Sequence, residues 1–474
     1  MNLAAPSPAP IPSTVTTAAA AAATVAALLS ELEDLKPVTD VQEVDRLSKD
    51  FAWFSPILAP QLADKHADAV FSPTTVDEMR RIVIACVKHR VPLSVRGGGT
   101  GNYGQLTPLQ GGVIISLLRF NKVVSIVPGI ARAQAGIRLG TLNREVLATG
   151  WELRMLPSTY KIASLGGFYS GGTGGIGSIN YGIFAARGNV LGVQMMTIED
   201  EPRVLELRGD DTQLLQHCWG TAGVVLEMEI ALAPAQPWDD TIAVFDDFDH
   251  GLCCASELAH SNGIARRLVS FHVDPIPQYL TPLGEYLPPK KHALLANIAG
   301  YSMDSFRHLV AKWGGEVTYH RASAELARVP QTLIEFTWNH TSLNALRVDP
   351  TLTYTQLRFA PNEHIEQVRA VYAALHPEMM LHLEFIRDAA GLTTCSALPL
   401  IRYTSPERID EIHDIVRALG VAVANPHTNS VGLGNKKALT PEFLRAKREY
   451  DPHGLMNPGK LVGVNEHPAL DIPS

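Results

Sequence analysis

Residues 96–104 read Arg-Gly-Gly-Gly-Thr-Gly-Asn-Tyr-Gly, and this first glycine segment decides between two folds. Its glycines satisfy the spacing GxGxxG, which is typical of a Rossmann dinucleotide site. A Rossmann site also requires a helix that opens at the loop. Here Pro108 and the glycine pair at 111–112 interrupt the chain, and 113–117 is predicted as a strand. We therefore expect a strand-loop-strand unit and exclude a Rossmann fold.

The elements around this segment alternate between helix and strand. Thr75 and Glu78 have the spacing of a helical capping box, and apolar residues recur at helical spacing from Met79 to Val87. We expect helices over 75–89 and 139–148, and strands over 91–95, 123–127, 132–137, 190–198, 203–208 and 222–232.

Residues 166–182 form a second glycine segment, with Gly166-Gly167, Gly171-Gly172, Gly174-Gly175, Gly177 and Gly182. So many glycines in a short stretch favour neither a helix nor a packed strand interior. Backbone without side chains lets N–H groups converge on an anion. We expect the two glycine segments to share a cleft around a flat or charged ligand, and a mobile loop is the alternative.

The pattern of elements changes near the proline-rich stretch 234–238. Strand-helix-strand units with antiparallel return strands follow to about residue 420, which is typical of an α+β sandwich. The predicted organisation is a flexible Ala/Pro-rich tail (1–28), a first domain (29–236), a cap domain with an antiparallel sheet (237–424), and a C-terminal segment that returns to the site (425–474).

Composition excludes several classes of protein. The 474 residues carry a formal net charge of −8 without a basic patch, so nucleic acid is not an expected partner. The 5 cysteines form no CxxC pair, which argues against a disulfide framework and favours a reducing, cytoplasmic location. No long apolar run predicts a membrane span. The alanine run at 18–23 follows no Lys or Arg, unlike a signal peptide.

The order of the motifs resembles the vanillyl-alcohol-oxidase (PCMH-type) FAD-binding superfamily. The resemblance covers about 70–235 and 425–463 and is weak across 240–420. Its motifs are Pro92 to Gly104, Pro128-Gly129, Leu156-Pro157-Ser158, Gly166-Gly167, Gly174-Gly175 with Tyr181-Gly182, Gly220 with Gly223, Asp451-Pro452 and Asn457-Pro458-Gly459-Lys460. The resemblance implies a two-subdomain FAD-binding domain below an α+β cap.

The same resemblance implies which residues hold FAD. The first glycine segment should wrap the diphosphate, with Asn102 toward the flavin, and the C-terminal residues should close the pocket. The implied set is Arg96, Gly97, Gly98, Gly99, Thr100, Gly101, Asn102, Tyr103, Pro157, Ser158, Gly167, Gly171, Gly174, Gly175, Ser178, Tyr181, Gly220, Gly223, Val225, Asn457 and Lys460.

The resemblance also bears on how FAD is attached and on metals. Thr100 stands where some members carry a His that tethers the flavin, and Tyr160 is nearest to the place of a tethering Cys. We therefore expect non-covalent FAD. The motifs are most similar to those of D-lactate/glycolate-type enzymes, which usually carry a His-rich metal motif. In this chain 426–432 reads Pro-His-Thr-Asn-Ser-Val-Gly, so no metal is expected.

Hydride removal from an alcohol needs a base, and a carboxylate substrate favours an arginine. Alternation along strands 353–359, 381–387 and 268–273 places titratable groups on one sheet face, which is either the roof of the site or a solvated surface. The candidates for catalysis are His427, His382, Glu384, Arg402, Arg358 and Tyr181. Tyr169 and Tyr181 could contact the flavin or only pack.

The function expected from these features is an FAD-dependent oxidase or dehydrogenase. It would transfer a hydride from the CH–OH group of a small alcohol or 2-hydroxy acid to FAD, with oxygen or another electron acceptor completing the cycle. A CH–NH donor and an NAD(P)H reductase rank lower. The alternative is a flavin-binding subunit or degenerate member without its own turnover. A homodimer is left open.

Overall fold

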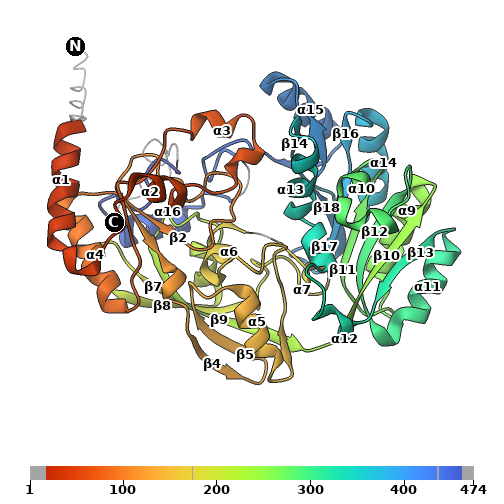
Figure 1. Cartoon of the computed structure of the whole chain (residues 1–474), viewed down its shortest axis with the longest axis horizontal. Helices are drawn as coiled ribbons and strands as arrows, with labels where there is room; N and C mark the ends of the chain where they lie inside the picture. Colours follow the sequence, from red (N-terminus) through yellow and green to blue (C-terminus); the bar gives the residue numbers. More distant parts are fainter. Residues whose placement is uncertain (1–17, 173, 435–436, 462–474) are drawn as a thin grey trace, which may run out of the picture.

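The computed structural model describes residues 18–172, 174–434 and 437–461 (Figure 1). The chain forms two parts. The N-terminal part, up to Pro234, contains a small parallel sheet and a larger antiparallel sheet, and the cap, from Trp238 to Ala424, contains a long antiparallel sheet covered by helices. This arrangement confirms the predicted α+β architecture with an antiparallel sheet in the cap. The division at 236/237 stays a prediction.

The small sheet carries the first glycine segment. Strands β1 (Ala69–Phe71), β3 (Val113–Ser116) and β2 (Leu93–Arg96) pair in parallel in that order. Helix α4 (Val76–His89) precedes β2 and is capped by Thr75, whose hydroxyl accepts a hydrogen bond from Glu78 N. No helix follows β2 before β3 in this fully described stretch, so the strand-loop-strand prediction is confirmed.

The larger sheet of the N-terminal part has the order β4-β5-β9-β7-β8, with β6 paired to β9. Its strands are β4 (Val123–Val127), β5 (Ile130–Gln134), β6 (Trp151–Leu153), β7 (Val190–Met196), β8 (Val204–Arg208) and β9 (Val224–Pro234), and helix α5 (Leu139–Leu147) packs on β6. The predicted strands and helix are confirmed, apart from shifts at their ends.

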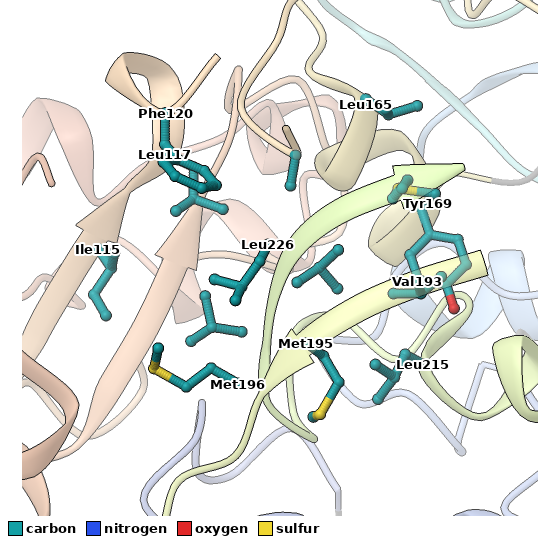
Figure 2. Packing of buried hydrophobic residues seen from close by; sticks show 14 of the residues in the cluster. Ile115, Leu117, Phe120, Leu165, Tyr169, Val193, Met195, Met196, Leu215 and Leu226 are labelled. Carbon is teal, nitrogen blue, oxygen red and sulfur yellow. The ribbon is translucent and has the colours of Figure 1, made fainter. Parts of the chain in front are cut away.

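One apolar cluster joins the two sheets of the N-terminal part. Ile115 and Leu117 from the β3 region and Met195 and Leu226 from β7 and β9 belong to this cluster and are buried (Figure 2). Full burial of such side chains stabilises the fold by about 1.5–3 kcal/mol each. The glycine segments are therefore attached to a rigid core.

The cap sheet is antiparallel, in the order β13-β10-β12-β11-β17-β18-β15-β20. These strands are β10 (Trp238–Phe245), β11 (Arg266–His272), β12 (His292–Ala299), β13 (Glu316–Arg321), β15 (Gln356–Arg358), β17 (His382–Arg387), β18 (Thr393–Ala397) and β20 (Ala422–Ala424). Helices α9 (Phe248–His260), α11 (Met303–Lys312), α14 (His364–Leu375) and α15 (Pro406–Ala418) pack against the strands in one apolar cluster. The other sheet face is covered in part by a second apolar cluster that includes Ile242, Leu295 and Phe336, and another part of the sheet borders the site.

The predicted strand 353–359 is wrong as a single strand. It splits into β14 (Leu352–Tyr354), which pairs with β19 (Leu400–Arg402) in a separate three-stranded sheet, and β15 in the cap sheet. Thr355 N donates to the carbonyl of Pro399. Because a proline has no backbone N–H, Pro399 cannot return a hydrogen bond and the strand pairing stops there. Tyr354 and Arg358 therefore do not share a sheet face.

Two other predictions fail for identifiable reasons. Residues 18–28 are not a flexible tail but most of helix α1 (Ala18–Glu31), since alanine favours helix and Leu28 is buried against the core. The second glycine segment contains helix α6 (Leu165–Gly171). Ser164 caps α6 by accepting from Gly167 N, and Gly166 needs its small size because a Cβ there would lie 2.7 Å from Ala135 Cβ.

Among the helices of the described ranges, none is long and apolar enough to cross a membrane.

The packing of α1 makes a prediction. Leu28→Ala should lower the free energy of unfolding by about 2–5 kcal/mol, because it leaves a cavity in the core beside α4. Ser30→Ala, at an exposed position of the same helix, is the matched control and should change little. Denaturant unfolding of both variants checks this. Equal stability of the Leu28 variant and wild type would contradict the packing of helix α1 against the core.

Candidate functional site

A cavity of about 300 Å³ lies between the N-terminal part and the cap. On one side it is lined by the first glycine segment, by 157–172 with Gly174, and by 217–225. On the other side it is lined by the ends of β15, β18 and β20 and by Trp338 and Asn339. Both glycine segments therefore face one cleft, as predicted.

The two glycine segments touch through backbone that has no room for side chains. A Cβ on Gly97 would lie 2.0 Å from Ser164 Oγ and 3.5 Å from Gly167 Cα. A Cβ on Gly98 would lie 2.3 Å from the carbonyl oxygen of Ile162. These contacts exist only because both positions are glycine, and they leave the nearby N–H groups accessible to a ligand.

A polar clasp, formed by Gln105, Asn457 and Lys460, holds the segments together. Gln105 Nε2 donates to the carbonyl of Gly171 at 2.9 Å, which links the first glycine segment to the second. Asn457 Nδ2 donates to the carbonyls of Gln105, at 2.9 Å, and Trp219, at 2.8 Å. Lys460 Nζ donates to the carbonyl of Gly104 at 2.6 Å. All three side chains are buried, so the C-terminal segment closes the site from behind.

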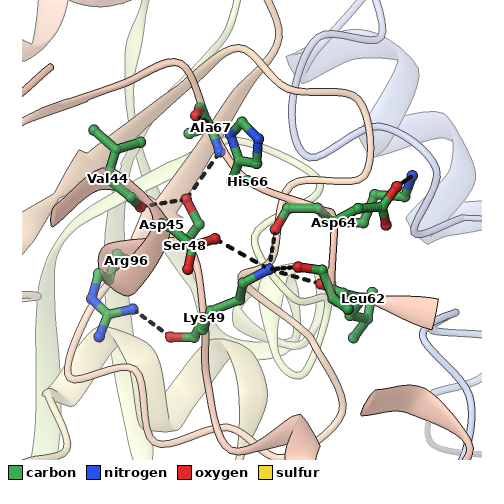
Figure 3. Close-up of polar contacts among 11 residues, drawn as sticks. Val44, Asp45, Ser48, Lys49, Leu62, Asp64, His66, Ala67 and Arg96 are labelled. Carbon is green, nitrogen blue, oxygen red and sulfur yellow. Dashed lines mark hydrogen bonds and ion pairs between the residues drawn. The ribbon is translucent and has the colours of Figure 1, made fainter. Parts of the chain in front are cut away.

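Arg96 and Lys49 fix the outer side of the first glycine segment (Figure 3). Arg96 Nη1 donates to the carbonyls of Leu47 and Lys49, at 2.8 and 2.9 Å. Lys49 Nζ donates to the carbonyls of Leu62, Ala63 and Lys65. The Arg96 side chain does not line the cavity, so it supports the loop from outside.

Asp50 and Lys460 are buried groups of opposite charge that interact electrostatically beside the loop. Asp50 lines the cavity, Oδ1 accepts from Ala52 N at 3.0 Å, and Oδ2 would lie 3.2 Å from a Cβ on Gly101. Burial raises the pKa of Asp50 to about 6, and the positive charge of Lys460 opposes that shift. Burial lowers the pKa of Lys460 to about 8, and the charge of Asp50 opposes it. Burial therefore favours the neutral form of each group, and their mutual attraction favours the charged forms.

Two donors on the N-terminal side of the cavity wall have no hydrogen-bond partner among the described residues, and Nε1 of Trp338 is a third on the cap side. The two are Nδ2 of Asn102 and Nε1 of Trp219, and both side chains are 3% exposed. An unpaired buried donor costs about 1–3 kcal/mol. A ligand that presents oxygen acceptors would satisfy them. Together with the glycine backbone, these donors fit the diphosphate and ring carbonyls of FAD.

Most residues of the implied FAD set line this cavity. They are Gly97, Gly98, Gly99, Thr100, Gly101, Asn102, Tyr103, Pro157, Ser158, Gly167, Gly171, Gly174, Gly220, Gly223 and Val225. Six of the set do not line it, namely Arg96, Gly175, Ser178, Tyr181, Asn457 and Lys460. Gly175 N donates to Ser178 Oγ within a tight turn. Arg96, Asn457 and Lys460 act on the loops from outside the cavity.

The candidate catalytic residues are mostly not in the cavity. Arg358, on β15, lines it and is exposed. Arg402 is exposed elsewhere and pairs with Asp349 at 3.5 Å. Tyr181 packs under the guanidinium of Arg154, 5.2 Å from its ring centre. Tyr169 is buried and donates to the carbonyl of Thr212.

His427, His382 and Glu384 are also buried behind the cavity wall. His427 Nδ1 shares a hydrogen bond of 2.8 Å with Ser55 Oγ. His382 Nε2 lies 2.8 Å from Glu384 Oε1 within a polar cluster under the cap sheet. Burial raises the pKa of Glu384 to about 8 and lowers that of His382 to about 3, so both groups favour their uncharged forms.

Several residues that line the cavity were not predicted from the sequence, namely Asp50, Gln105, His217, Trp219, Trp338 and Asn339. Gln105 directly follows the first glycine segment, and its amide could have been suspected there. Asp50 and Trp338 lie in no motif, since only tertiary contacts bring them to the cavity. Within the described residues, no group of three or more His, Cys, Asp or Glu could hold a metal ion.

Comparisons with known proteins show what the chain is similar to. Residues 67–206 match the family model described as an FAD binding domain. The chain is 24% identical to the glycolate oxidase subunit GlcD of Bacillus subtilis over 428 residues, covering 83% of this chain and 88% of the relative. It is 22% identical to the D-lactate dehydrogenase of Archaeoglobus fulgidus over 481 residues, covering 92% and 98%.

The fold also matches a solved structure. An alkyldihydroxyacetonephosphate synthase superposes with a TM-score of 0.68 at 14% identity, covering 92% of this chain and 85% of that chain. At this identity, the match supports the architecture only.

The glycine contacts predict an effect on cofactor binding. Gly98→Ala should weaken FAD binding by about tenfold or more. The new Cβ would meet the backbone of Ile162, so the two glycine segments would have to move apart. Gly263→Ala, where a Cβ would meet open space, is the control. Titration of the apoprotein with FAD measures both affinities. An unchanged affinity for the Gly98 variant would contradict the role of the two glycine segments in FAD binding.

Proposed function

We propose that this chain, which carries the FAD-binding domain of the vanillyl-alcohol-oxidase (PCMH-type) superfamily, oxidises the CH–OH group of a small 2-hydroxy acid. That it is an FAD-linked oxidoreductase follows from its family match and relatives. The donor class is our inference. A glycolate oxidase subunit and a D-lactate dehydrogenase are among the relatives, and both names refer to 2-hydroxy-acid chemistry.

The observation that carries the substrate proposal is the charge of the cavity wall. Among the lining residues of the described chain, Arg358 is the only lysine or arginine. It lies on the cap side, on β15 between Ser396 of β18 and Ala422 of β20. A guanidinium at this place can bind a carboxylate with two hydrogen bonds and orient the neighbouring CH–OH carbon.

The cofactor would be held on the opposite side by the first and second glycine segments. FAD, when bound, accepts the hydride from the donor carbon. Thr100 lines the cavity, and we propose that FAD is bound there without a covalent link. Oxygen or another electron acceptor would then reoxidise it.

Asp50 is the lining side chain best suited to accept the hydroxyl proton. Its raised pKa of about 6 keeps it ionised at neutral pH but makes it a stronger base than an ordinary aspartate. Tyr103, which also lines the cavity, has a pKa raised by burial and stays protonated. Before the hydroxyl proton is transferred, the positive charge of Lys460 can balance the negative charge of Asp50.

An anaerobic assay tests the donor class and Arg358 together. The purified holoprotein is mixed with a series of 2-hydroxy acids and matched alcohols without a carboxylate, and flavin absorbance is followed. A 2-hydroxy acid should bleach the flavin. Arg358→Met should raise KM about 10–100-fold, because one charge-assisted contact is lost. Arg402→Met, outside the cavity, should not.

This assay also separates the competing hypotheses. Bleaching by no donor would favour a flavin-binding subunit without its own turnover. Equal turnover of the alcohols, or equal KM values for wild type and the Arg358 variant, would contradict the role given to the carboxylate.

The pH dependence tests Asp50. A proton acceptor must be unprotonated, so kcat/KM should fall as pH falls through about 6. Asp50→Asn should lower the rate of flavin reduction about 10²–10⁴-fold and remove this acidic limb. FAD content and Tm of the variant control for damage to the fold. Asp34→Asn, at an exposed ion pair, should leave the profile intact. Persistence of the limb in the Asp50 variant would exclude this role.

A further inference from the structure

Trp338 has a backbone conformation that side chains rarely adopt. Its φ is 51° and its ψ is −137°, immediately before helix α13 (Asn339–Val348). A residue with a Cβ is strained in this region, and such strain persists only where surrounding contacts enforce it. Strained residues of this kind cluster at ligand sites.

Glu384 is the contact that enforces the conformation. Its Oε1 accepts a hydrogen bond from Trp338 N at 2.7 Å, and it also accepts from Ser270 Oγ at 2.8 Å. Glu384 is 1% exposed and lies on β17, inside the cap sheet. The carboxyl group of Glu384, which is fixed by its own strand, therefore holds the turn.

The residues on either side of Trp338 are fixed as well. Thr337 Oγ1 donates to the carbonyl of Ile334 at 3.1 Å, and Thr341 Oγ1 donates to that of Phe336 at 2.8 Å. Both threonines are fully buried. The turn between them has little freedom to relax.

The indole of Trp338 reaches across from the cap to the second glycine segment. Trp338 lines the cavity, and a Cβ on Gly174 would lie 2.5 Å from its Cη2 atom. Its Nε1 is buried and has no hydrogen-bond partner among the described residues. The cap therefore places one large, rigid side chain against the backbone of the cofactor side, with a donor left to be satisfied.

We propose that Trp338 is the wall of the cavity that limits the size of the donor, and that Glu384 is a positioning residue which holds this wall through the Trp338 N–H. This inference rests on the proposed function. It extends that function by assigning a selection for short-chain 2-hydroxy acids, since the indole occupies space that a longer chain would need.

One small residue, Ser396, lies between Arg358 and the strand that holds the indole. Ser396 of β18 is opposite Arg358 of β15 on one side and opposite Glu384 of β17, which binds Trp338 N, on the other. A donor whose carboxylate is bound at Arg358 and whose chain runs toward β17 would pass the small Ser396 side chain and then meet Trp338. Removal of the indole should therefore admit longer chains and should not affect the carboxylate contact.

The test compares donors and unreactive ligands of increasing chain length. Initial rates are measured for 2-hydroxy acids from two to eight carbons, and binding of the corresponding simple carboxylates is measured from the perturbation of the flavin spectrum. In Trp338→Ala, the ratio of kcat/KM for the longest over the shortest donor should rise about tenfold or more. Trp53→Ala, at an exposed tryptophan, is the matched control and should leave the ratio unchanged.

Two substitutions separate positioning from simple structural support. Glu384→Gln keeps an oxygen that can accept from Trp338 N, so the chain-length preference should stay within about threefold of wild type. Glu384→Leu cannot accept, so its preference should move toward that of Trp338→Ala while FAD remains bound. A merely structural role would lower stability in both variants without altering the preference.

The outcomes distinguish this inference from the proposed function. If wild type is reduced by no 2-hydroxy acid and binds no carboxylate, the proposed function fails and this inference fails with it. If wild type reacts and binds, but Trp338→Ala keeps the same chain-length dependence, only the role of Trp338 is overturned. If Glu384→Leu keeps the wild-type preference, the role of Glu384 alone is overturned.

Discussion

Two side-chain amides, those of Gln105 and Asn457, determine whether the site exists. Gln105 links the first glycine segment to the second through Gly171, and Asn457 links the first segment to the backbone at Trp219. Glycine-rich backbone has high conformational entropy when free, so the segments would not stay together without such contacts. Since Asn457 lies far along the chain, the cleft depends on contact between the C-terminal segment and the N-terminal part.

The charges of the cavity wall indicate which side would bind the cofactor and which side would bind the substrate. No lysine or arginine lines the cofactor side in the described chain, so an anionic diphosphate would be stabilised there by backbone N–H groups, Asn102 and Trp219. Arg358 supplies a permanent positive charge on the cap side. Asp50 also lines the cavity, and the buried Lys460, which does not line it, interacts electrostatically with Asp50. The cavity can thus bind a substrate through its carboxylate and also contain a group that accepts the hydroxyl proton.

The sequence was sufficient for features set by local patterns and insufficient for features set by distant contacts. The first glycine segment, the absence of a following helix, and most strands were predicted because turn residues and period-two alternation are local signals. Glu384 and His382 were correctly placed on one sheet face, since Ser270 pairs with Glu384 and His272 with His382 across the strands. Around His382 and Glu384 that face is covered beside α13, however, and among the described strands of the cap the cavity is lined by Ile386 of β17 and by residues of β15, β18 and β20.

The remaining errors have the same origin. Nothing near Asp50 in the sequence indicates that it will lie beside Gly101, and Trp338 reaches the site through a carboxylate on a distant strand. The break at Thr355 depends on the carbonyl of Pro399, and the helical state of 18–28 depends on packing of Leu28 against the core. Each of these is decided by a tertiary partner.

A crystal structure of the chain with FAD bound tests the central claim most directly. The account predicts that the diphosphate oxygens lie within hydrogen-bond distance of backbone N–H groups in 97–101, with the ring between the second glycine segment and β15, and with Gln105 still bonded to Gly171. A diphosphate bound elsewhere, or an isoalloxazine ring outside the cavity lined by Arg358 and Trp338, would contradict it.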